Sequence, residues 1–374
     1  MGKSLTEIAQ QLKDSDKRVQ LIYAFNGVGK TRLSCEFKEL VSPKDEDNAE
    51  IEEPPYKILY YNAFTEDLFY WDNDLDNDQD RKIKIQPNSF TDWLLKDEGQ
   101  ENVISDHFLH YTNSKLSPNF DEKFSEITFS AQSNDGTNLN NIKISKGEES
   151  NFVWCVFYAM LELVVTELKS EKDTRSTKKF DDLKYIFIDD PVTSLDENHL
   201  IKLAVDLARL VKESPDGLKF IITTHNPLFF NVLHNEIKGN NKYILCKYAD
   251  NTYSLKEQKN DSPFSYHNYL LAELEEAIES DSVHKYHFNF LRNIFEKTST
   301  FLGYTNWGDL LPEDKKHYYT RLVNISSHSK FSSMEVPPMP DEDKQMLKEL
   351  AKLLFEKYHF KRIPELNTRN EAEQ

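Results

Sequence analysis

The sequence of 374 residues is poor in cysteine, glycine and long apolar runs. Its three cysteines, Cys35, Cys155 and Cys246, are odd in number and far apart, so they form neither a disulfide framework nor a CxxC metal site. Only 10 glycines and 14 prolines exclude a collagen-like or low-complexity chain. No apolar run reaches the roughly 18 residues of a membrane span, and the polar N-terminal residues do not resemble a secretory signal. We therefore expect a globular protein of the reducing cytoplasm that does not enter a membrane.

Positive charge is also scarce, because 46 Lys and Arg stand against 64 Asp and Glu, for a formal net charge of −18. Such a chain does not coat nucleic acid or anionic membrane non-specifically. The deficit is uneven: residues 265–374 contain 14 Lys and Arg against 18 Asp and Glu, or −4, which leaves −14 for residues 1–264. An anionic ligand must therefore bind at a local basic site.

The hydrophobic pattern predicts an α/β region followed by a mostly helical one. Strands are expected at 19–24, in KILYYNAF, and in LKYIFIDD and LKFIITTH, which are apolar on both faces as buried parallel strands are. Short strands are expected in ITFSAQS and NIKIS, and a strand pair with an Asp-Asn turn in YILCKYADNTYSLKE. Helices are expected at 30–41, 151–169, 198–212 and, in several pieces, from 266 to 360. The turn-rich DSPF at 261–264 marks the boundary between two domains, 1–264 and 265–374.

The sequence AFNGVGKT at 24–31 matches the phosphate-binding loop G-x-x-x-x-G-K-[ST], except that Ala24 replaces the first Gly. It lies between a predicted strand and a predicted helix, which favours a phosphate site over a chance Gly-rich turn. Its glycines turn backbone N–H groups toward phosphate, the lysine reaches the terminal phosphates, and the threonine hydroxyl binds Mg²⁺. The residues expected to hold a nucleotide are Asn26, Gly27, Gly29, Lys30 and Thr31.

A second nucleotide motif is YIFIDDP, in which four apolar strand residues precede Asp189 and Asp190. Asp189 is placed to organise the Mg²⁺ shell and Asp190 to orient or activate the attacking water. A strand-end Asp pair is equally a turn or a helix cap when taken alone. Three further segments follow a recognisable order: ISKGEE upstream, SLD at 194–196, and a strand that ends at His225.

Together these motifs resemble an ABC-class ATPase of the chromosome-maintenance and DNA-repair type. The resemblance implies a mixed sheet with flanking helices, a D-loop at Asp196 and a switch histidine at His225. It also implies that Ser145, Gly147 and Glu148 form a signature that caps the γ-phosphate of a nucleotide on the opposite subunit, in a head-to-tail dimer.

Two positions depart from this pattern. Lys146 replaces the usual second Gly of the signature, and Asp190 replaces the customary Glu, so slow turnover or a nucleotide sensor is favoured over fast hydrolysis. Asn62 is either a substitute for the glutamine of the ABC glutamine loop or an ordinary loop residue. The 83 residues from Asn62 to Ser145 contain no heptads, which excludes long coiled-coil arms, and a transporter subunit would leave the C-terminal region unexplained.

In the C-terminal region, Arg292 and Glu296 are spaced i,i+4 on a predicted helix, and His328 stands among serines. Taken alone, the first two are an ordinary helix-face ion pair. However, VQLIYAFNGVGKTRLS, YYNAFTEDLFYWDND, KGEESNF and the segment from YHF to FLGY resemble the PrrC-type anticodon nucleases over nearly the whole chain. The resemblance implies an ABC-type nucleotide-sensing domain followed by a helical ribonuclease domain that cuts lysine tRNA 5′ of the wobble base, with Arg292, Glu296 and His328 as its catalytic group.

The implied chemistry is attack of the ribose 2′-OH on the adjacent phosphate without a metal, which leaves 2′,3′-cyclic phosphate and 5′-OH ends. Glu296 or His328 takes the hydroxyl proton, the other protonates the leaving oxygen, and Arg292 stabilises the phosphorane. The resemblance further implies ATP or GTP with Mg²⁺, dTTP as a ligand, and a type Ic restriction–modification enzyme as the silencing partner of a latent anti-phage suicide defence.

Substrate recognition is implied for Asp261, in a loop that is shortened relative to the family. Base stacking or core packing is open for three aromatic residues, Tyr266, Tyr286 and Phe290. Phosphate contact or simple solvent exposure is open for four basic residues, Lys256, Lys259, Lys285 and Arg321.

Two other classes of function stay open at this stage. One is a DNA-repair-type ABC ATPase whose C-terminal helices only bind partners. The other is a scaffold that lends its ATPase to a separate nuclease subunit.

Overall fold

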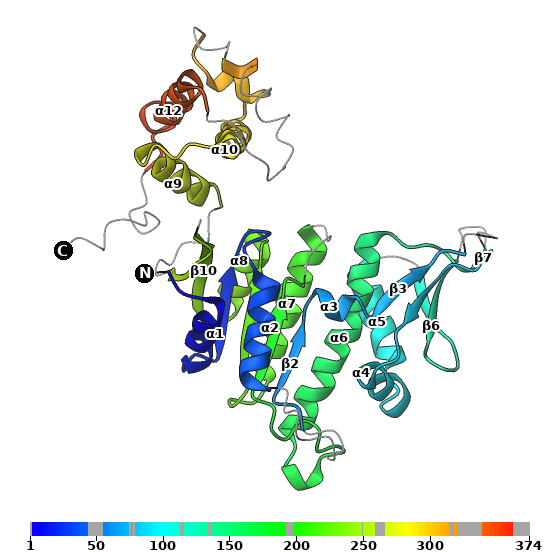
Figure 1. Cartoon of the computed structure of the whole chain (residues 1–374). Coiled ribbons are helices and arrows are strands. Elements are labelled where there is room, and N and C mark those ends of the chain that lie inside the picture. The colour runs from blue at the N-terminus through cyan, green and yellow to red at the C-terminus, as the bar shows by residue number, and fades with distance from the viewer. Residues whose placement is uncertain are drawn as a thin grey trace. The chain divides into compact units, whose positions relative to one another are not determined.

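A computed structural model describes residues 2–43, 55–74, 76, 79–112, 116–132, 137–191, 197–248, 250–258, 266–313, 318–320 and 339–361 (Figure 1). The chain divides into two units, Met1–Ser262 and Pro263–Gln374. The residues Asp196, Asp261, His328, Lys259 and Arg321 lie outside the described residues.

The first unit contains a six-stranded sheet in the order β11-β10-β1-β9-β8-β2. The strands are β1 (Val19–Tyr23), β2 (Ile58–Tyr61), β8 (Tyr185–Asp189), β9 (Lys219–Thr224), β10 (Asn241–Lys247) and β11 (Tyr253–Glu257). Neighbours are parallel except β10 and β11, which form the predicted antiparallel pair with Asn251 in the left-handed region at its turn. The predicted mixed α/β sheet is therefore confirmed.

Helices cover both faces of this sheet because its central strands are apolar on both sides (Figure 1). Successive strand residues point to opposite faces. Ile22 belongs to a buried cluster with α1 (Leu5–Asp14) and α2 (Lys30–Val41), whereas the next residue, Tyr23, contacts Phe230 of α8 (Pro227–Glu236). Helix α7 (Glu197–Glu213) packs against α8.

A second, antiparallel sheet has the order β3-β4-β6-β5, with β7 also paired to β6. Its strands are β3 (Phe69–Asp72), β4 (Lys82–Ile85), β5 (Leu116–Phe120), β6 (Glu126–Gln132) and β7 (Asn138–Leu139). The neighbouring helical pieces are α3 (Ala63–Glu66), α4 (Ser89–Asp92), a π-helical turn (Trp93–Asp97) and α5 (Glu101–Thr112). Alternation along β6 buries Ile127 and Phe129 on one face, which is the pattern of a sheet with one covered side.

Helix α6 (Lys146–Lys169) connects the two sheets. Near its start, Phe152 packs against Phe69, Phe108 and Phe129, and two residues later Trp154 contacts Tyr61 of β2. The helix is long and apolar enough to cross a membrane, but 72% of its apolar stretch is buried inside the fold. The predicted burial of this helix is confirmed.

The predicted start of α6 at 151 and the predicted strand NIKIS were both wrong. Ser145 caps the helix, because its side chain accepts the N–H of Glu148 (3.2 Å) while the Glu148 carboxylate accepts the N–H of Ser145 (2.8 Å). This capping box starts the helix at Lys146 and ends any extended run before it. The alternating residues 141–145 instead lead from β7 into the cap, with one hydrogen bond from Ile142 N–H to Phe129 O (2.9 Å).

The second unit is helical in the part that the structure describes. Its elements are α9 (Tyr266–Glu279), α10 (Lys285–Leu302), a 3₁₀ turn (Trp307–Leu310) and α12 (Asp341–Glu356). Leu291 and Phe295 of α10 are fully buried, and Trp307 lies over the rings of Phe295 and Tyr319. Gly303 ends α10 in the left-handed conformation that glycine adopts without strain.

Candidate functional site

The carboxyl ends of parallel strands β1, β9 and β8 meet at one edge of the large sheet. The register pairs Tyr23 of β1 with Thr224 of β9, and Thr223 of β9 with Asp189 of β8. The loop 24–29 after β1 therefore opens beside the acidic residues that end β8. In open α/β sheets, ligands bind outside such strand ends.

The loop after β1 has the backbone of a phosphate cradle. Gly27 and Gly29 have φ of 81° and 116°, a region where residues with a side chain are strained, and Gly29 caps α2 without any side-chain hydrogen bond. The N–H groups of the first turn of α2 are thus not capped by a side chain, and the positive end of the helix dipole faces the loop. The Lys30 ammonium donates to Ala24 O (3.2 Å) and to Asn26 Oδ1 (3.1 Å).

Thr31 and Asp189, the pair of residues expected to hold Mg²⁺, are hydrogen-bonded to each other. Thr31 Oγ1 donates to Asp189 Oδ2 (2.6 Å), and Thr223 Oγ1 donates to the other carboxylate oxygen. Burial raises the pKa of Asp189 above its ordinary value, although the hydroxyl hydrogen bonds act against this. Hydroxyl and carboxylate oxygens are ligands that Mg²⁺ prefers, and the cation carries the charge that would favour the ionised carboxylate. The residues present therefore fit a nucleotide with Mg²⁺.

Asp190 lies between two cationic or ionisable partners. Its carboxylate is 3.2 Å from Lys30 Nζ and 2.6 Å from His225 Nδ1. Burial opposes ionisation, but the His225 hydrogen bond and the Lys30 charge outweigh it, so the pKa of Asp190 is lowered. The structure thus brings Lys30, Asp190 and His225 together, as the motif order predicts.

Backbone geometry gives a reason for aspartate at position 190. Its φ is 53°, in the left-handed region that Asp and Asn tolerate better than longer side chains do. The customary Glu of the resembled family would be strained in this conformation.

The signature segment lies at the N-terminus of α6. Ser145 and Glu148 hydrogen-bond to each other, and Gly147 occupies the first turn. Within this chain, neither the Ser145 nor the Glu148 side chain hydrogen-bonds to the phosphate loop at 24–29. Behind the segment, Glu149 is buried and accepts hydrogen bonds from Trp71 Nε1 (2.6 Å) and from Lys146 (2.7 Å). The lysine at the departing position thus pairs along its own helix.

Sequence reasoning missed two groups of residues around this site. Thr223 could have been found from the sequence, because it directly precedes Thr224 and His225 at the end of a predicted strand. Its hydrogen bond to Asp189, however, depends on the register of β8 and β9. The link between Trp71 and Glu149 had no sequence signal, since 78 residues separate them.

Asn62, interpreted from the sequence as either a glutamine-loop substitute or an ordinary loop residue, is fully buried. Its side chain donates to Ser34 Oγ (3.2 Å), and the Ser34 hydroxyl donates to Thr31 O (2.8 Å). Asn62 is therefore connected to Thr31 through one intervening residue.

The second unit places Arg292 and Glu296 one turn apart on α10. Arg292 Nε donates to Glu296 Oε1 (2.7 Å), and the two side chains are 36% and 43% exposed. Both groups are therefore held in one geometry and are still accessible to a ligand. The third residue of the predicted catalytic group, His328, is outside the described residues, as is Asp261.

Comparison with known proteins gives the following matches. A family model described as an AAA domain matches residues 101–356. The Smc head domain of Pyrococcus furiosus, solved with an extended coiled coil and bound to the C-terminal domain of ScpA, is 14% identical with a TM-score of 0.29 and covers 44% of this chain and 36% of that chain. The SMC head domain from Thermotoga maritima is 10% identical with a TM-score of 0.30, and covers 65% of this chain and 91% of that chain.

A curated relative matches far more closely. An anticodon nuclease from Escherichia coli is 52% identical over 371 residues, which cover 91% of this chain and 94% of the relative. Because less than a tenth of the chain lies outside this alignment, both units contribute to it. The family resemblance carried by the motifs is thus confirmed, and the chain belongs to the anticodon nuclease family.

Proposed function

We propose that this chain is a nucleotide-gated endoribonuclease that cleaves the anticodon loop of a tRNA. The observation that carries the proposal is the 52% identity to an anticodon nuclease over nearly the full length of both chains. The fixed, accessible Arg292–Glu296 pair in the helical unit supports it, because attack of a ribose 2′-OH on the adjacent phosphate needs a proton acceptor beside a cation.

In the proposed reaction, the ribose 2′-OH attacks the adjacent phosphorus and the bond to the leaving 5′-oxygen breaks. One of Glu296 and His328 takes the hydroxyl proton, and the other gives a proton to the leaving oxygen. Arg292 stabilises the charge of the phosphorane. The products are a 2′,3′-cyclic phosphate and a 5′-OH end, and no metal takes part.

The nucleotide site supplies the proposed gate. In the structure, Lys30 pairs with Asp190, and Asp190 also pairs with His225. A bound γ-phosphate competes for Lys30 and so frees Asp190, which makes the contacts of the switch histidine depend on occupancy. We propose ATP or GTP with Mg²⁺ as the gating ligand and dTTP as a stabilising one.

The finer features of the proposal follow the family. The substrate is lysine tRNA, cut 5′ of the wobble base, with Asp261 contributing to recognition. Two copies of the chain sandwich the nucleotide between the phosphate loop of one and the Ser145 segment of the other. A type Ic restriction–modification enzyme holds the nuclease latent in the cytoplasm, and its release serves as a suicide defence against phage.

The direct test is cleavage of purified total tRNA by the purified full chain in the presence of EDTA, followed by end mapping. Wild-type protein is expected to give one cut in the anticodon loop of lysine tRNA, with a cyclic phosphate at the new 3′ end. A tRNA with 2′-deoxyribose at the cut site is expected to resist cleavage. Cleavage of that substrate would overturn the mechanism.

A matched ion pair elsewhere in the same unit provides the control. Lys352 and Glu356 are also spaced i,i+4, on α12, with 3.2 Å between Lys352 Nζ and Glu356 Oε1. Arg292→Ala and Glu296→Gln are expected to lower the cleavage rate at least about 100-fold, whereas Lys352→Ala and Glu356→Gln leave it unchanged. Equal activity of all four variants would contradict the catalytic roles of Arg292 and Glu296.

A further inference from the structure

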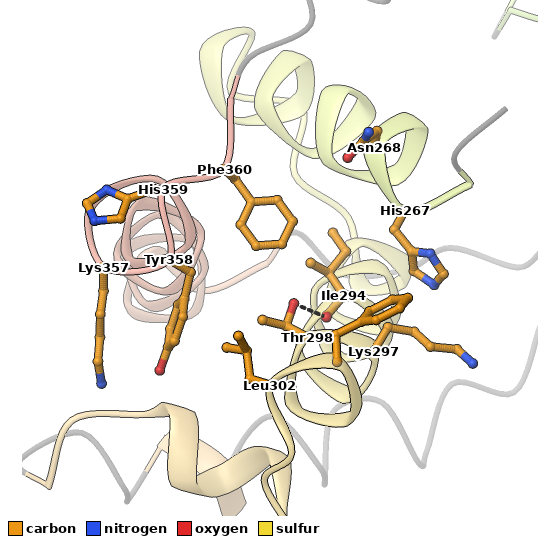
Figure 2. Close-up of a pocket in the computed structure, with 11 residues that line it drawn as sticks. His267, Asn268, Ile294, Lys297, Thr298, Leu302, Lys357, Tyr358, His359 and Phe360 are labelled. Atoms are coloured by element: carbon orange, nitrogen blue, oxygen red, sulfur yellow. Dashed lines mark hydrogen bonds between the residues drawn. The ribbon is translucent and has the colours of Figure 1, made fainter. Parts of the chain in front are cut away.

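A pocket of about 470 Å³ lies in the second unit between α9, α10 and the residues that follow α12 (Figure 2). Its size falls in the roughly 300–1,000 Å³ range of small-ligand sites. Figure 2 shows Ile294, Leu302, Tyr358 and Phe360 around the hollow, with the Phe360 ring directed toward its centre. The pocket therefore has apolar and aromatic walls.

Two lysines and two histidines line this pocket, together with the neutral polar residues Asn268 and Thr298. His267 and Lys297 lie at one side of the hollow, and Lys357 and His359 lie at the opposite side (Figure 2). None of the described residues that line it is acidic. This composition differs from that of residues 265–374 as a whole, whose net charge is −4. An anionic ligand with a flat apolar part fits such a site.

The pocket is separate from the predicted catalytic pair on α10. Residues advance about 100° each around a helix, so Ile294, Thr298 and Phe301 share one face. Arg292 and Glu296 stand two residues on either side of Ile294, and both therefore project about 160° away from it. A ligand in the pocket contacts the opposite side of α10 from the catalytic pair.

Aromatic side chains continue from the pocket along the same side of α10. Tyr286, Phe290, Lys297 and Phe301 fall within about 60° of one another on the helix. The rings of Tyr286 and Phe290 are in edge contact, with centroids 5.4 Å apart. Phe301 is 86% exposed and Tyr286 is 43% exposed. Exposed rings interleaved with lysine are the surface on which proteins stack the bases of single-stranded nucleic acid.

We propose that this pocket binds one unstacked nucleotide of a single-stranded RNA, with the base against Phe301 and Phe360 and its phosphates at Lys297 and Lys357. This proposal rests on the proposed function and adds a second RNA contact to it, away from the bond that is cut. Lys297 has no ion-pair partner in the described part of the chain, so its charge is available. Lys357 donates to Leu310 O (3.2 Å), a neutral acceptor that leaves its charge uncompensated.

His267 supplies a third polar contact. Its Nε2 atom is buried and has no hydrogen-bond partner among the residues that the structure describes. Burial lowers the pKa of His267, against a hydrogen bond with Asn293 and with a further contribution from the Lys297 charge, and this favours the neutral ring. A neutral imidazole both donates and accepts hydrogen bonds, as recognition of a base edge requires.

The test compares Phe301→Ala and Lys297→Ala in the full chain. Phe301 is so exposed that its removal leaves the fold intact, and loss of one stacked base weakens RNA binding roughly 5- to 100-fold. Binding of a fluorescent heptamer of single-stranded RNA is measured by anisotropy in an Arg292→Ala background, and KM and kcat for tRNA are measured in the otherwise wild-type chain. We expect Kd and KM to rise in both variants, with kcat changed less than about twofold. Lys297→Ala is also expected to lower the magnitude of the slope of log K against log salt concentration by about 1.

Two neighbouring side chains outside the pocket are the matched controls. Tyr304 is 44% exposed just beyond α10, and the Lys352 side chain is 70% exposed on α12. Tyr304→Ala and Lys352→Ala are expected to keep wild-type Kd and KM. Equal effects in control and pocket variants would overturn the proposal, because they would indicate general loss of surface charge or apolar area.

The remaining outcomes separate this proposal from the proposed function. If wild-type protein cuts tRNA while Phe301→Ala and Lys297→Ala keep its KM, the nuclease stands and the pocket is not an RNA site. If no tRNA is cut but heptamer binding depends on Phe301, the pocket stands and the nuclease fails. A third outcome is that poly-glutamate of equal charge displaces the heptamer and Phe301→Ala has no effect on binding. This would show that the pocket attracts anions without recognising a base, and it would overturn the proposal.

Discussion

At the scale of single residues, two adjacent carboxylates at one strand end have pKa values that are shifted in opposite directions. Burial raises the pKa of Asp189, whereas His225 and Lys30 outweigh burial at Asp190 and lower its pKa. Neighbouring carboxylates whose pKa values are shifted in opposite directions can take different chemical roles in one site. Asp190 therefore stays ionised to a lower pH than an ordinary aspartate, whereas Asp189 takes up its proton at a higher pH than usual.

The first prediction concerns the pH dependence of Mg²⁺-nucleotide binding. A carboxyl with a raised pKa takes up its proton at a higher pH than usual, so Mg²⁺ loses its ligand as the pH falls from 7.5 toward 5. We expect magnesium-dependent binding of a fluorescent nucleotide to weaken as the pH falls, at a higher pH than an ordinary aspartate ligand would give, and to recover when the pH is raised. Asp189→Asn should show weak binding at every pH. A pH-independent magnesium effect in the wild type would contradict this assignment.

Several residues that the sequence patterns assign to the nucleotide site lie together in the structure, because each is positioned by its local context. Lys30 and Thr31 begin a helix after a strand, and Asp189 ends another strand, so the edge of a parallel sheet brings them together. The bond from Thr223 and the buried contact of Trp71 with Glu149 arise from strand register and from the packing of distant segments. Neither is encoded within a short window of the sequence.

At the scale of elements, the start of α6 carries both a structural and a proposed binding role. The N-cap Ser145 satisfies a backbone donor of the first turn, and the same hydroxyl is proposed to contact the γ-phosphate of a nucleotide on a second copy of the chain. The apolar period predicted the burial of this helix, but it gave a start at 151 because only the capping residues, and not the core residues, mark the first turn.

The second prediction separates these two roles of Ser145. Ser145→Ala removes the cap and is expected to lower the free energy of unfolding by about 1 kcal/mol, whereas Ser145→Asp keeps an equally good cap and preserves it. Both variants should lose nucleotide-dependent dimerisation, since alanine lacks the hydroxyl and aspartate repels the phosphate. Denaturant titration and light scattering with nucleotide measure the two effects. Normal dimerisation of Ser145→Ala would remove Ser145 from the proposed sandwich.

Helix α10 contains the clearest acid-sensitive group among the described residues. His287 is 3% exposed, and its Nδ1 accepts the N–H of His284 (2.9 Å). Burial, with a further contribution from His284, lowers the pKa of His287 to about 4. The unfolded chain therefore binds this proton more readily than the folded one, so stability is complete above about pH 6.5 and falls as the pH drops toward 4.

The third prediction is that His287 accounts for on the order of 2 kcal/mol of the stability lost between pH 7 and pH 4.5. His287→Gln should therefore flatten the pH dependence of unfolding of the helical unit, measured by thermal denaturation across this interval. The control is His359→Asn, because His359 is exposed and Asn tolerates its φ of 54°. A pH profile of His287→Gln parallel to that of the wild type would contradict the prediction.

At the scale of the whole molecule, the sequence predicted a mixed α/β unit followed by a helical one, and the structure has both kinds of secondary structure in that order. Long apolar or amphipathic segments made this possible. The antiparallel sheet of β3 to β7 was predicted only in part, because its strands are short and pair across loops. The negative charge also has a clearer meaning: the acidic excess is in the nucleotide-binding unit, and the basic pocket is in the other unit.

The last prediction is that nucleotide binding in the first unit controls tRNA cleavage in the second unit, whereas the catalytic pair of the second unit does not affect nucleotide binding. Lys30→Ala removes the cation that meets the terminal phosphates, so it should abolish nucleotide binding and make tRNA cleavage insensitive to added nucleotide. Arg292→Ala should abolish cleavage by at least about 100-fold while leaving nucleotide binding and its magnesium dependence at wild-type levels. Cleavage of lysine tRNA and nucleotide binding are measured on the same preparations. Nucleotide-responsive cleavage in Lys30→Ala would place the gate outside the phosphate loop, and loss of nucleotide binding in Arg292→Ala would mean that the helical unit contributes to that site.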